Sequence, residues 1–252
     1  MLIRRNTSPE NGGEDGHYYI SISDLMSSLL FIFILILSYV MLSFVKKEDE
    51  LSNEIKKIEQ NIEFRAELLQ NLQKELVGKD INVEIDKENG NMRLKSDLLF
   101  QSGSAEISNE GKRQIGEIAH LFINKMIEER YKSAIDTIFI EGHTDSVPIK
   151  VSNSCRQLWS NKELSAQRAI NTYTQMLSAT DSQIALLKNI KEKHLLSYSG
   201  YADNRQLCQE TLLDANATKE AIDACRGKNR RIEFYFTVNT PDTKKIREKI
   251  GE

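Results

Sequence analysis

The chain has 252 residues, of which 40% are hydrophobic and 28% are charged, and its formal net charge is −3. This composition excludes a disordered chain, a collagen and a membrane protein with many spans. A negative net charge also argues against a protein that coats nucleic acid, so no direct binding to nucleic acid is expected. The length suffices for one ordinary domain with extra parts, or for two small domains.

One segment near the start of the chain is far more apolar than this average. The 21 residues from Leu25 to Val45 carry no charge, and as a helix they would span about 31 Å, the thickness of a bilayer core. A cleaved signal peptide would have a shorter apolar core and a small-x-small cleavage site, which Tyr39–Lys47 lacks. We therefore predict a single uncleaved transmembrane helix over residues 18–45, preceded by a polar tail over 1–17.

The cysteines bear on the compartment of the rest of the chain. Cys208 and Cys225 lie 17 positions apart in a polar stretch, and a disulfide between them would require an oxidising compartment. Cys155 would then be left over. Three cysteines allow three different single pairings, so their spacing does not assign the bridge. The flanking charges do not decide orientation either, because basic residues stand on both sides of the apolar segment.

A heptad pattern follows the apolar segment over residues 46–79. Its seam consists of Leu51, Ile55, Ile58, Ile62, Arg65, Leu69, Leu72 and Leu76. Such a seam is typical of a coiled coil, so we expect residues 46–79 to form a stalk in which two chains pair. The alternative is a solitary amphipathic helix that lies on the following domain.

From residue 80 the hydrophobic period changes to two. The expected elements are a hairpin around Asn89-Gly90, a helix after Ser108, a strand over 137–141, a helix over 162–177, a short helix over 182–191, a strand over 194–199, a polar loop over 201–228 and a strand over 231–238. The fold class is therefore α+β, with a two-layer α/β sandwich in which helices cover one face of a mixed sheet. Residues 239–252 are expected to be a C-terminal tail.

Five motifs occur in order within this region: Leu99-Phe100 with Ser102–Ser108 (SGSAEIS), Glu141–Asp145 (EGHTD), Asn161–Ala169 (NKELSAQRA), Gly200 onward (GYADNRQ) and Asn229–Glu233 (NRRIE). They resemble the OmpA C-terminal peptidoglycan-binding family over about residues 80–238. The resemblance implies an OmpA-like domain that binds the cell wall. The Cys208/Cys225 pair also resembles a disulfide found in some OmpA domains.

The membrane end carries a second resemblance. Ile20–Leu30 (ISISDLMSSLL), followed by FIFILIL, resembles the B-subunit family of the Zorya anti-phage defence system, a stator-like family with one helix and an OmpA-like domain. The insert that holds Pro148 and ends in Ser160-Asn161 resembles flagellar stator B subunits more than outer-membrane OmpA. The resemblance implies a homodimer in the bacterial inner membrane, with a cytoplasmic N-terminus, a periplasmic C-terminal domain, and a multi-span A subunit in a ratio of five A to two B.

Asp24 stands at the entry of the apolar segment, with Ser27 and Ser28 on the same helical face. A carboxylate there is costly unless it is neutralised or faces a polar cavity, and such a group can take up and release a proton. The alternative is a helix N-cap, because Asp caps well and the apolar run begins at the next residue. The resemblance to stator B subunits, whose corresponding aspartate carries protons, favours the proton-carrying role.

Asp145 and Arg168 are the candidate cell-wall ligands. Diaminopimelate in peptidoglycan carries an ammonium and a carboxylate on one carbon, and a carboxylate with a guanidinium complements that pair. The resemblance assigns the ammonium to Asp145 and the carboxylate to Arg168, while Asn161 and Leu164 shape the pocket. The alternative is an internal Asp–Arg salt bridge. Arg230, in the last motif, is interpreted as structural.

No pattern of catalytic residues is found. The histidines are scattered without ligand spacing, and His143 in the EGHTD motif is interpreted as a packing residue. We therefore expect no enzymatic activity, no cofactor and no metal. The whole sequence predicts a peptidoglycan-anchored subunit of a proton-driven, stator-type motor, with the Zorya B subunit favoured. The alternatives are a flagellar stator subunit and a passive peptidoglycan-binding tether.

Overall fold

The computed structural model describes residues 14–101, 103–149 and 160–241, with side chains from Ile22 onward. They form two compact units, one that reaches Ile55 and one over Lys56–Pro241. Most of the predicted tails and the segment around Cys155 lie outside the described residues.

The first element is helix α1 (Glu14–Val77), which contains the apolar segment. From Ile22 onward it is long and apolar enough to cross a membrane, with a mean hydropathy of 2.6 in its most apolar window. Leu25, Phe33 and Leu42 point in different directions around the helix and expose 67%, 60% and 72% of their surface. A helix that is apolar on all sides is typical of a membrane span. The predicted apolar helix is thus confirmed, although it continues past Val45 to Val77.

The second half of the heptad seam lies inside the second unit. Leu69, Leu72 and Leu76 are all 0% exposed and belong to its hydrophobic core. This is the packing expected of an amphipathic helix that lies on the following domain, the alternative to the paired stalk. Ile55 and Ile62, earlier in the seam, are 47% and 40% exposed. Pairing of two chains therefore stays a prediction, and the side chains that remain available for it lie before Arg65.

Arg65, the polar member of the seam, is buried and fastens α1 to the first hairpin. Its Nη2 donates to the carbonyl of Glu88 at 2.7 Å, and its Nη1 donates to the carbonyl of Phe236 at 3.3 Å. Gly90 occupies the turn with φ of +80°, and a Cβ there would lie 2.6 Å from the Arg65 Nη1. The predicted turn at Asn89-Gly90 is confirmed, and both backbone conformation and Arg65 require glycine at its second position.

The domain is built on one mixed sheet. Its strands are β1 (Glu84–Asp86), β2 (Asn91–Lys95), β3 (Ile135–His143), β4 (Leu196–Ala202) and β5 (Arg231–Val238), in the order β1-β2-β5-β3-β4. The pair β3–β4 is parallel, and the other neighbouring pairs are antiparallel. The predicted mixed sheet is confirmed, and β5 has the bounds expected from the sequence.

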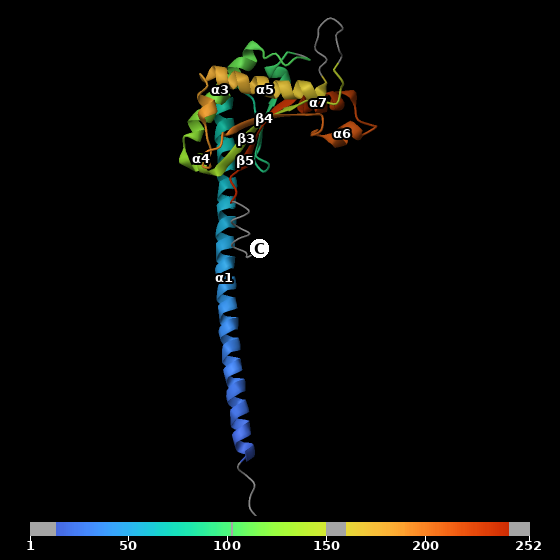
Figure 1. Ribbon diagram of the computed structural model, residues 1–252. Coiled ribbons are helices and arrows are strands. Elements are labelled where there is room, and N and C mark those ends of the chain that lie inside the picture. The colour runs from blue at the N-terminus through green and yellow to red at the C-terminus, as the bar shows by residue number, and fades with distance from the viewer. Residues whose placement is uncertain (1–13, 102, 150–159, 242–252) are drawn as a thin grey trace, which may run out of the picture. The chain divides into compact units, whose positions relative to one another are not determined.

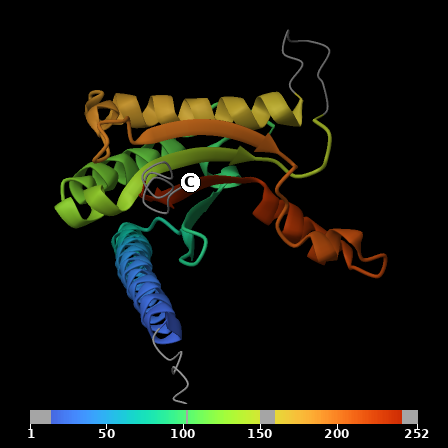
Figure 2. The same cartoon turned by 60° about the horizontal axis from the view of Figure 1, so that its bottom comes forward.

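Two helices cover one face of this sheet, α3 (Asn109–Met126) and α5 (Asn161–Ala179) (Figures 1 and 2). The Ser108 hydroxyl accepts from the Gly111 amide at 2.9 Å and caps α3, as the sequence predicts. Phe122 of α3 meets Phe234 and Phe236 edge to face, with ring centroids 5.3 and 5.5 Å apart. The shorter elements are α2 (Ser96–Leu99), α4 (Glu129–Ala134) and the 3₁₀ helix η1 (Gln183–Leu186).

The predicted polar loop over 201–228 is wrong, because this segment contains α6 (Gln209–Leu213) and α7 (Lys219–Asn229). The Thr218 hydroxyl accepts from the Ala221 amide at 3.2 Å and caps α7. Within α7 only Cys225 and Asn229 are buried, so the helix lacks the apolar stripe that hydrophobic periodicity detects. The capping residue Thr218 could have indicated the start of α7 in the sequence. The helix has no apolar face, however, so hydrophobic periodicity could not indicate it.

Removal of a seam leucine tests this packing. Leu72→Ala should lower the free energy of unfolding by about 2–5 kcal/mol, because it leaves a cavity in the core. Ile55→Ala, at an exposed seam position, should change it by less than about 1 kcal/mol. Chemical denaturation of the detergent-solubilised full chain, followed by near-ultraviolet circular dichroism, measures both. Equal losses would contradict the burial of the second half of the seam.

Pairing of two chains is tested by crosslinking in a Cys155→Ser background. A cysteine at Ile58 should form an interchain disulfide under mild oxidation, because this seam position precedes the buried part of α1. A cysteine at Gln60, on the opposite face, and one at Leu72, inside the core, should not. Equal crosslinking at Ile58 and Gln60 would contradict the pairing of two chains along this seam.

Candidate functional site

Asp145 lies in the loop that follows β3, as the sequence predicts, and is 9% exposed. The Thr144 amide donates to the carbonyl of Ala202 at 2.9 Å, which ties the start of this loop to the end of β4. The Asp145 Oδ1 accepts from the amide of Val147 at 3.1 Å. Its Oδ2 accepts from the Nη1 of Arg230 at 2.8 Å. The carboxylate is therefore held in one orientation and is neutralised by Arg230.

Arg168 projects from α5 and is 3% exposed. Its Nε donates to the carbonyl of Ser104 at 2.9 Å, and its guanidinium carbon lies 5.1 Å from the centroid of the Phe100 ring. Among the described residues no carboxylate forms an ion pair with it. Burial lowers the pKa of Arg168 to about 10, although the fields of Asp97 and Asp145 oppose this effect. A buried guanidinium without a paired carboxylate is costly, and an incoming carboxylate would relieve that cost.

Arg230 links two carboxylates and was not recognised as a site residue from the sequence. Besides Asp145, it binds Asp97 in bidentate fashion, with Nε–Oδ1 and Nη2–Oδ2 distances of 3.1 and 2.8 Å. These hydrogen bonds, first to Asp97 and then to Asp145, raise the pKa of Arg230. The internal salt bridge of Asp145 is thus made by Arg230 and not by Arg168. Arg230 could have been found because it belongs to the NRRIE motif; Asp97 carried no signal.

Asn161 and Leu164 stand at the start of α5. The Asn161 Nδ2 donates to the carbonyls of Asp145 and Val147 at 3.1 and 3.2 Å, so it fastens the Asp145 loop to the helix. Leu164 is 4% exposed. The Ser160–Glu163 capping box fixes the first turn of α5. These contacts bring Asn161 together with Asp145 as expected, and they give Asn161 a positioning role.

A disulfide joins Cys208 to Cys225, with an S–S distance of 2.08 Å. It links the segment after β4 to α7. Close to the bridge, the Asn229 side chain is fully buried and its Oδ1 accepts from the amide of Leu207 at 2.6 Å. Since Asn229 precedes Arg230 in the chain, the same segment helps to fix the end of α7 from which Arg230 reaches Asp145.

Asp24 lies on α1 at the entry of the apolar segment and is exposed, as are Ser27 and Ser28. It belongs to the first compact unit, whereas Asp145 and Arg168 belong to the second. The candidate proton-carrying residue and the candidate wall-binding residues therefore belong to different units.

His143 is buried, and its ring stacks on Tyr201 with the ring centroids 5.5 Å apart. Among the described residues no group of three or more His, Cys, Asp or Glu side chains could hold a metal ion.

No protein-family model matches the chain, whereas individual proteins and solved structures do. The Zorya protein ZorB of Escherichia coli (Crooks strain) is 27% identical over 227 residues, which cover 90% of each chain. Motility protein B of Bacillus subtilis is 29% identical over 144 residues, which cover 57% of this chain and 43% of that protein. A crystal structure of a MotB-like protein from Desulfovibrio vulgaris shares the fold, with a TM-score of 0.50 and 22% identity over 73% of this chain and 97% of that one.

The chain thus resembles the OmpA/MotB-like proteins, the class that its motifs predict, in both sequence and fold. Within this class, it resembles the Zorya protein ZorB along most of its length. A match over 227 of 252 residues includes part of the apolar helix as well as the domain. The second predicted resemblance, to the Zorya B subunit, is confirmed on that basis.

Removal of the Arg168 guanidinium tests the candidate site. In the detergent-solubilised full chain, Arg168→Ala should weaken binding to peptidoglycan sacculi by about thirtyfold or more, because loss of a partner in a buried charge pair costs about 2–5 kcal/mol. Arg113→Ala is the matched control, since Arg113 is an exposed arginine that pairs with Glu110 on α3. Co-sedimentation with sacculi measures binding, and circular dichroism verifies folding. Undiminished binding by a folded Arg168→Ala protein would contradict the assignment.

Proposed function

We propose that this chain is a peptidoglycan-anchored, stator-type subunit of a proton-driven motor complex, acting as the B subunit of a Zorya-type anti-phage defence system. The observation that carries the proposal is the match to the Zorya protein ZorB over 90% of both chains. The apolar helix supports a membrane location, and the domain fold supports an anchor. In this proposal the N-terminus is cytoplasmic and the domain is periplasmic in the inner membrane.

The proposed anchor is the pair of buried side chains Asp145 and Arg168, which lie near enough for the charge of Asp145 to raise the pKa of Arg168. Its proposed ligand is the diaminopimelate centre, whose carboxylate would pair with the buried and otherwise unpaired Arg168. The ammonium of the ligand would compete with Arg230 for Asp145. Arg230 keeps its bidentate bond to Asp97 in that exchange, so no buried charge is left without a partner. The disulfide is compatible with an oxidising compartment such as the periplasm.

The proton-carrying group in this proposal is Asp24. One helix cannot enclose an ion path, so the proposal requires a multi-span A subunit against which Asp24 lies. By resemblance, a homodimer of this chain would sit among five A subunits. The flagellar stator is a second candidate, and the match to Motility protein B supports it, but that match covers 57% of this chain. A passive tether is the third candidate, in which Asp24 takes no part in ion flow. The N-cap role considered for Asp24 is wrong, because α1 begins at Glu14 and Asp24 lies inside the helix.

A single conservative substitution distinguishes a proton-driven motor subunit from a passive tether. Asp24→Asn keeps size and hydrogen bonding but cannot ionise, so it should abolish protection against phage while the protein still co-purifies with its A partner. A passive tether needs no ionisable group at this position, so it predicts full activity for Asp24→Asn. The measurement is plaque formation on cells that express the complete system.

Asp49→Asn serves as the matched control. It removes a carboxylate from the same helix, beyond the apolar segment, and should leave protection unchanged. A fully protective, normally expressed Asp24→Asn protein would contradict the role as a motor subunit and would favour the passive tether. Rescue of swimming in a stator-deficient strain, without protection against phage, would favour the flagellar candidate.

A further inference from the structure

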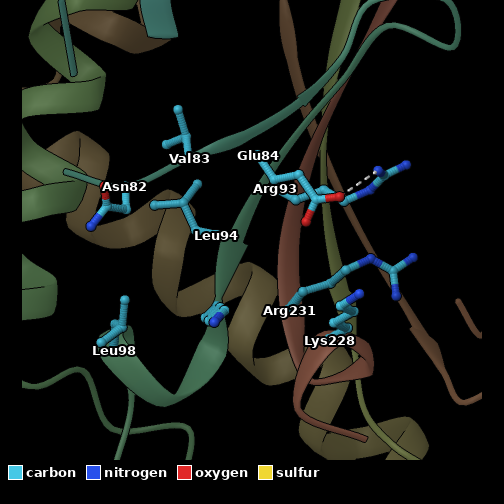
Figure 3. Close-up of a pocket in the computed structure, with 9 residues that line it drawn as sticks. Asn82, Val83, Glu84, Arg93, Leu94, Leu98, Lys228 and Arg231 are labelled. Atoms are coloured by element: carbon cyan, nitrogen blue, oxygen red, sulfur yellow. Dashed lines mark ion pairs between the residues drawn. The ribbon is translucent and has the colours of Figure 1, made fainter. Parts of the chain in front are cut away.

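A pocket with a volume of about 350 Å³ opens at the β1 side of the sheet (Figure 3). It is lined by Asn82, Val83, Glu84, Arg93, Leu94, Lys95, Leu98, Lys228 and Arg231. None of these residues belongs to the candidate wall-binding site. In Figure 3 the apolar side chains lie on one side of the pocket and most of the charged ones on the other. The pocket therefore offers both a charged wall and an apolar wall.

The pocket exists because β1 covers only part of β2. The pairing of the two strands reaches Glu84 and Arg93 and then stops. The segment before β1 turns toward α1 instead, where the amide of Ile81 donates to the carbonyl of Leu76 at 2.9 Å. The edge of β2 at Leu94 and Lys95 is thereby left without a neighbouring strand on that side among the described residues. Helices α2 and α7 supply the remaining walls.

Positive charge exceeds negative charge in this pocket. Four of the lining residues are basic, and one, Glu84, is acidic. The Arg93 guanidinium is already paired, with Glu84, Asp86 and Glu233 at 3.6, 3.2 and 3.2 Å. Lys95 and Lys228 form no ion pair within the described part of the chain. Two ammonium groups thus remain for an anion.

Arg231 lines the pocket from the start of β5. It is 5% exposed, and its Nε donates to the Glu233 Oε2 at 2.7 Å while its Nη2 donates to the carbonyl of Arg205 at 3.2 Å. Its Nη1 is buried and has no hydrogen-bond partner among the described residues. This atom has almost no accessible surface, so it is not a donor to a group bound in the pocket, and the exposed Lys95 and Lys228 are the cations that such a group would contact.

We propose that this pocket binds a phosphate group, either as a free or monoester phosphate or within a phosphodiester. A phosphate offers more acceptor oxygens than a carboxylate, and a free or monoester phosphate also carries more charge, which matches the two ammonium groups of Lys95 and Lys228. The apolar wall at Val83 and Leu98 would accommodate the organic part of an ester. This site goes beyond the proposed wall anchor and does not depend on it.

The test uses isothermal titration calorimetry of the detergent-solubilised full chain with inorganic phosphate and, separately, with glycerophosphoglycerol at constant ionic strength. Saturable binding is expected for at least one of them. The double variant Lys95→Gln/Lys228→Gln should weaken it by about tenfold or more, because charge-assisted hydrogen bonds are lost. Lys219→Gln, at the other end of α7, is the matched control and should bind like the unmodified chain. Binding of inorganic phosphate indicates a monoester or free phosphate, and binding of the diester alone indicates a diester.

A second measurement needs no variant. The bound ligand should protect Lys228, and not Lys219, from an amine-acylating reagent, as read by mass spectrometry of the unmodified chain. No saturable binding of either compound would overturn the proposal. Equal binding by the folded double variant and the control, or equal acylation of both lysines with and without ligand, would overturn it as well.

Discussion

The last turns of α1 are buried in the core of the domain, and the rest of the domain depends on this packing. Leu69, Leu72 and Leu76 fill the core together with the aromatic face of β5, and Arg65 holds the first hairpin by its carbonyls. Part of the heptad segment that was predicted to form a stalk therefore belongs to the hydrophobic core of the domain. A fragment that begins at Asp80 would expose this apolar surface, so a soluble domain has to include α1 from about Lys56 onward.

The site at Asp145 follows from the placement of two arginines. Arg230 neutralises Asp145 and Asp97, whereas Arg168 is buried with a backbone carbonyl and an aromatic ring as its neighbours. In the absence of ligand the buried positive charge is thus partly uncompensated. A zwitterionic ligand would supply a carboxylate to Arg168 and an ammonium to Asp145 without leaving Arg230 unpaired. This charge arrangement is the physical basis for proposing a wall anchor.

The sequence predicted the elements whose hydrophobic pattern is strong. β5, α3 and α5 were expected close to their observed bounds because apolar side chains alternate or recur along them. Helix α7 was missed because it buries almost no apolar side chain. The heptad was ambiguous because the same apolar spacing is expected whether the seam packs on a second chain or on the domain. The motifs identified Asp145, Asn161 and Arg168, but they did not indicate that Arg230, distant in sequence, would neutralise Asp145.

We propose that Asp24 carries protons while the domain holds the cell wall. Proton flux into liposomes that contain this chain with its A partner tests it most directly, with an internal pH-sensitive dye and an imposed membrane potential. The account predicts flux for the unmodified complex and background flux for an equally reconstituted Asp24→Asn complex. Equal flux from both complexes, or none from either when the complex is intact and activated, would contradict it.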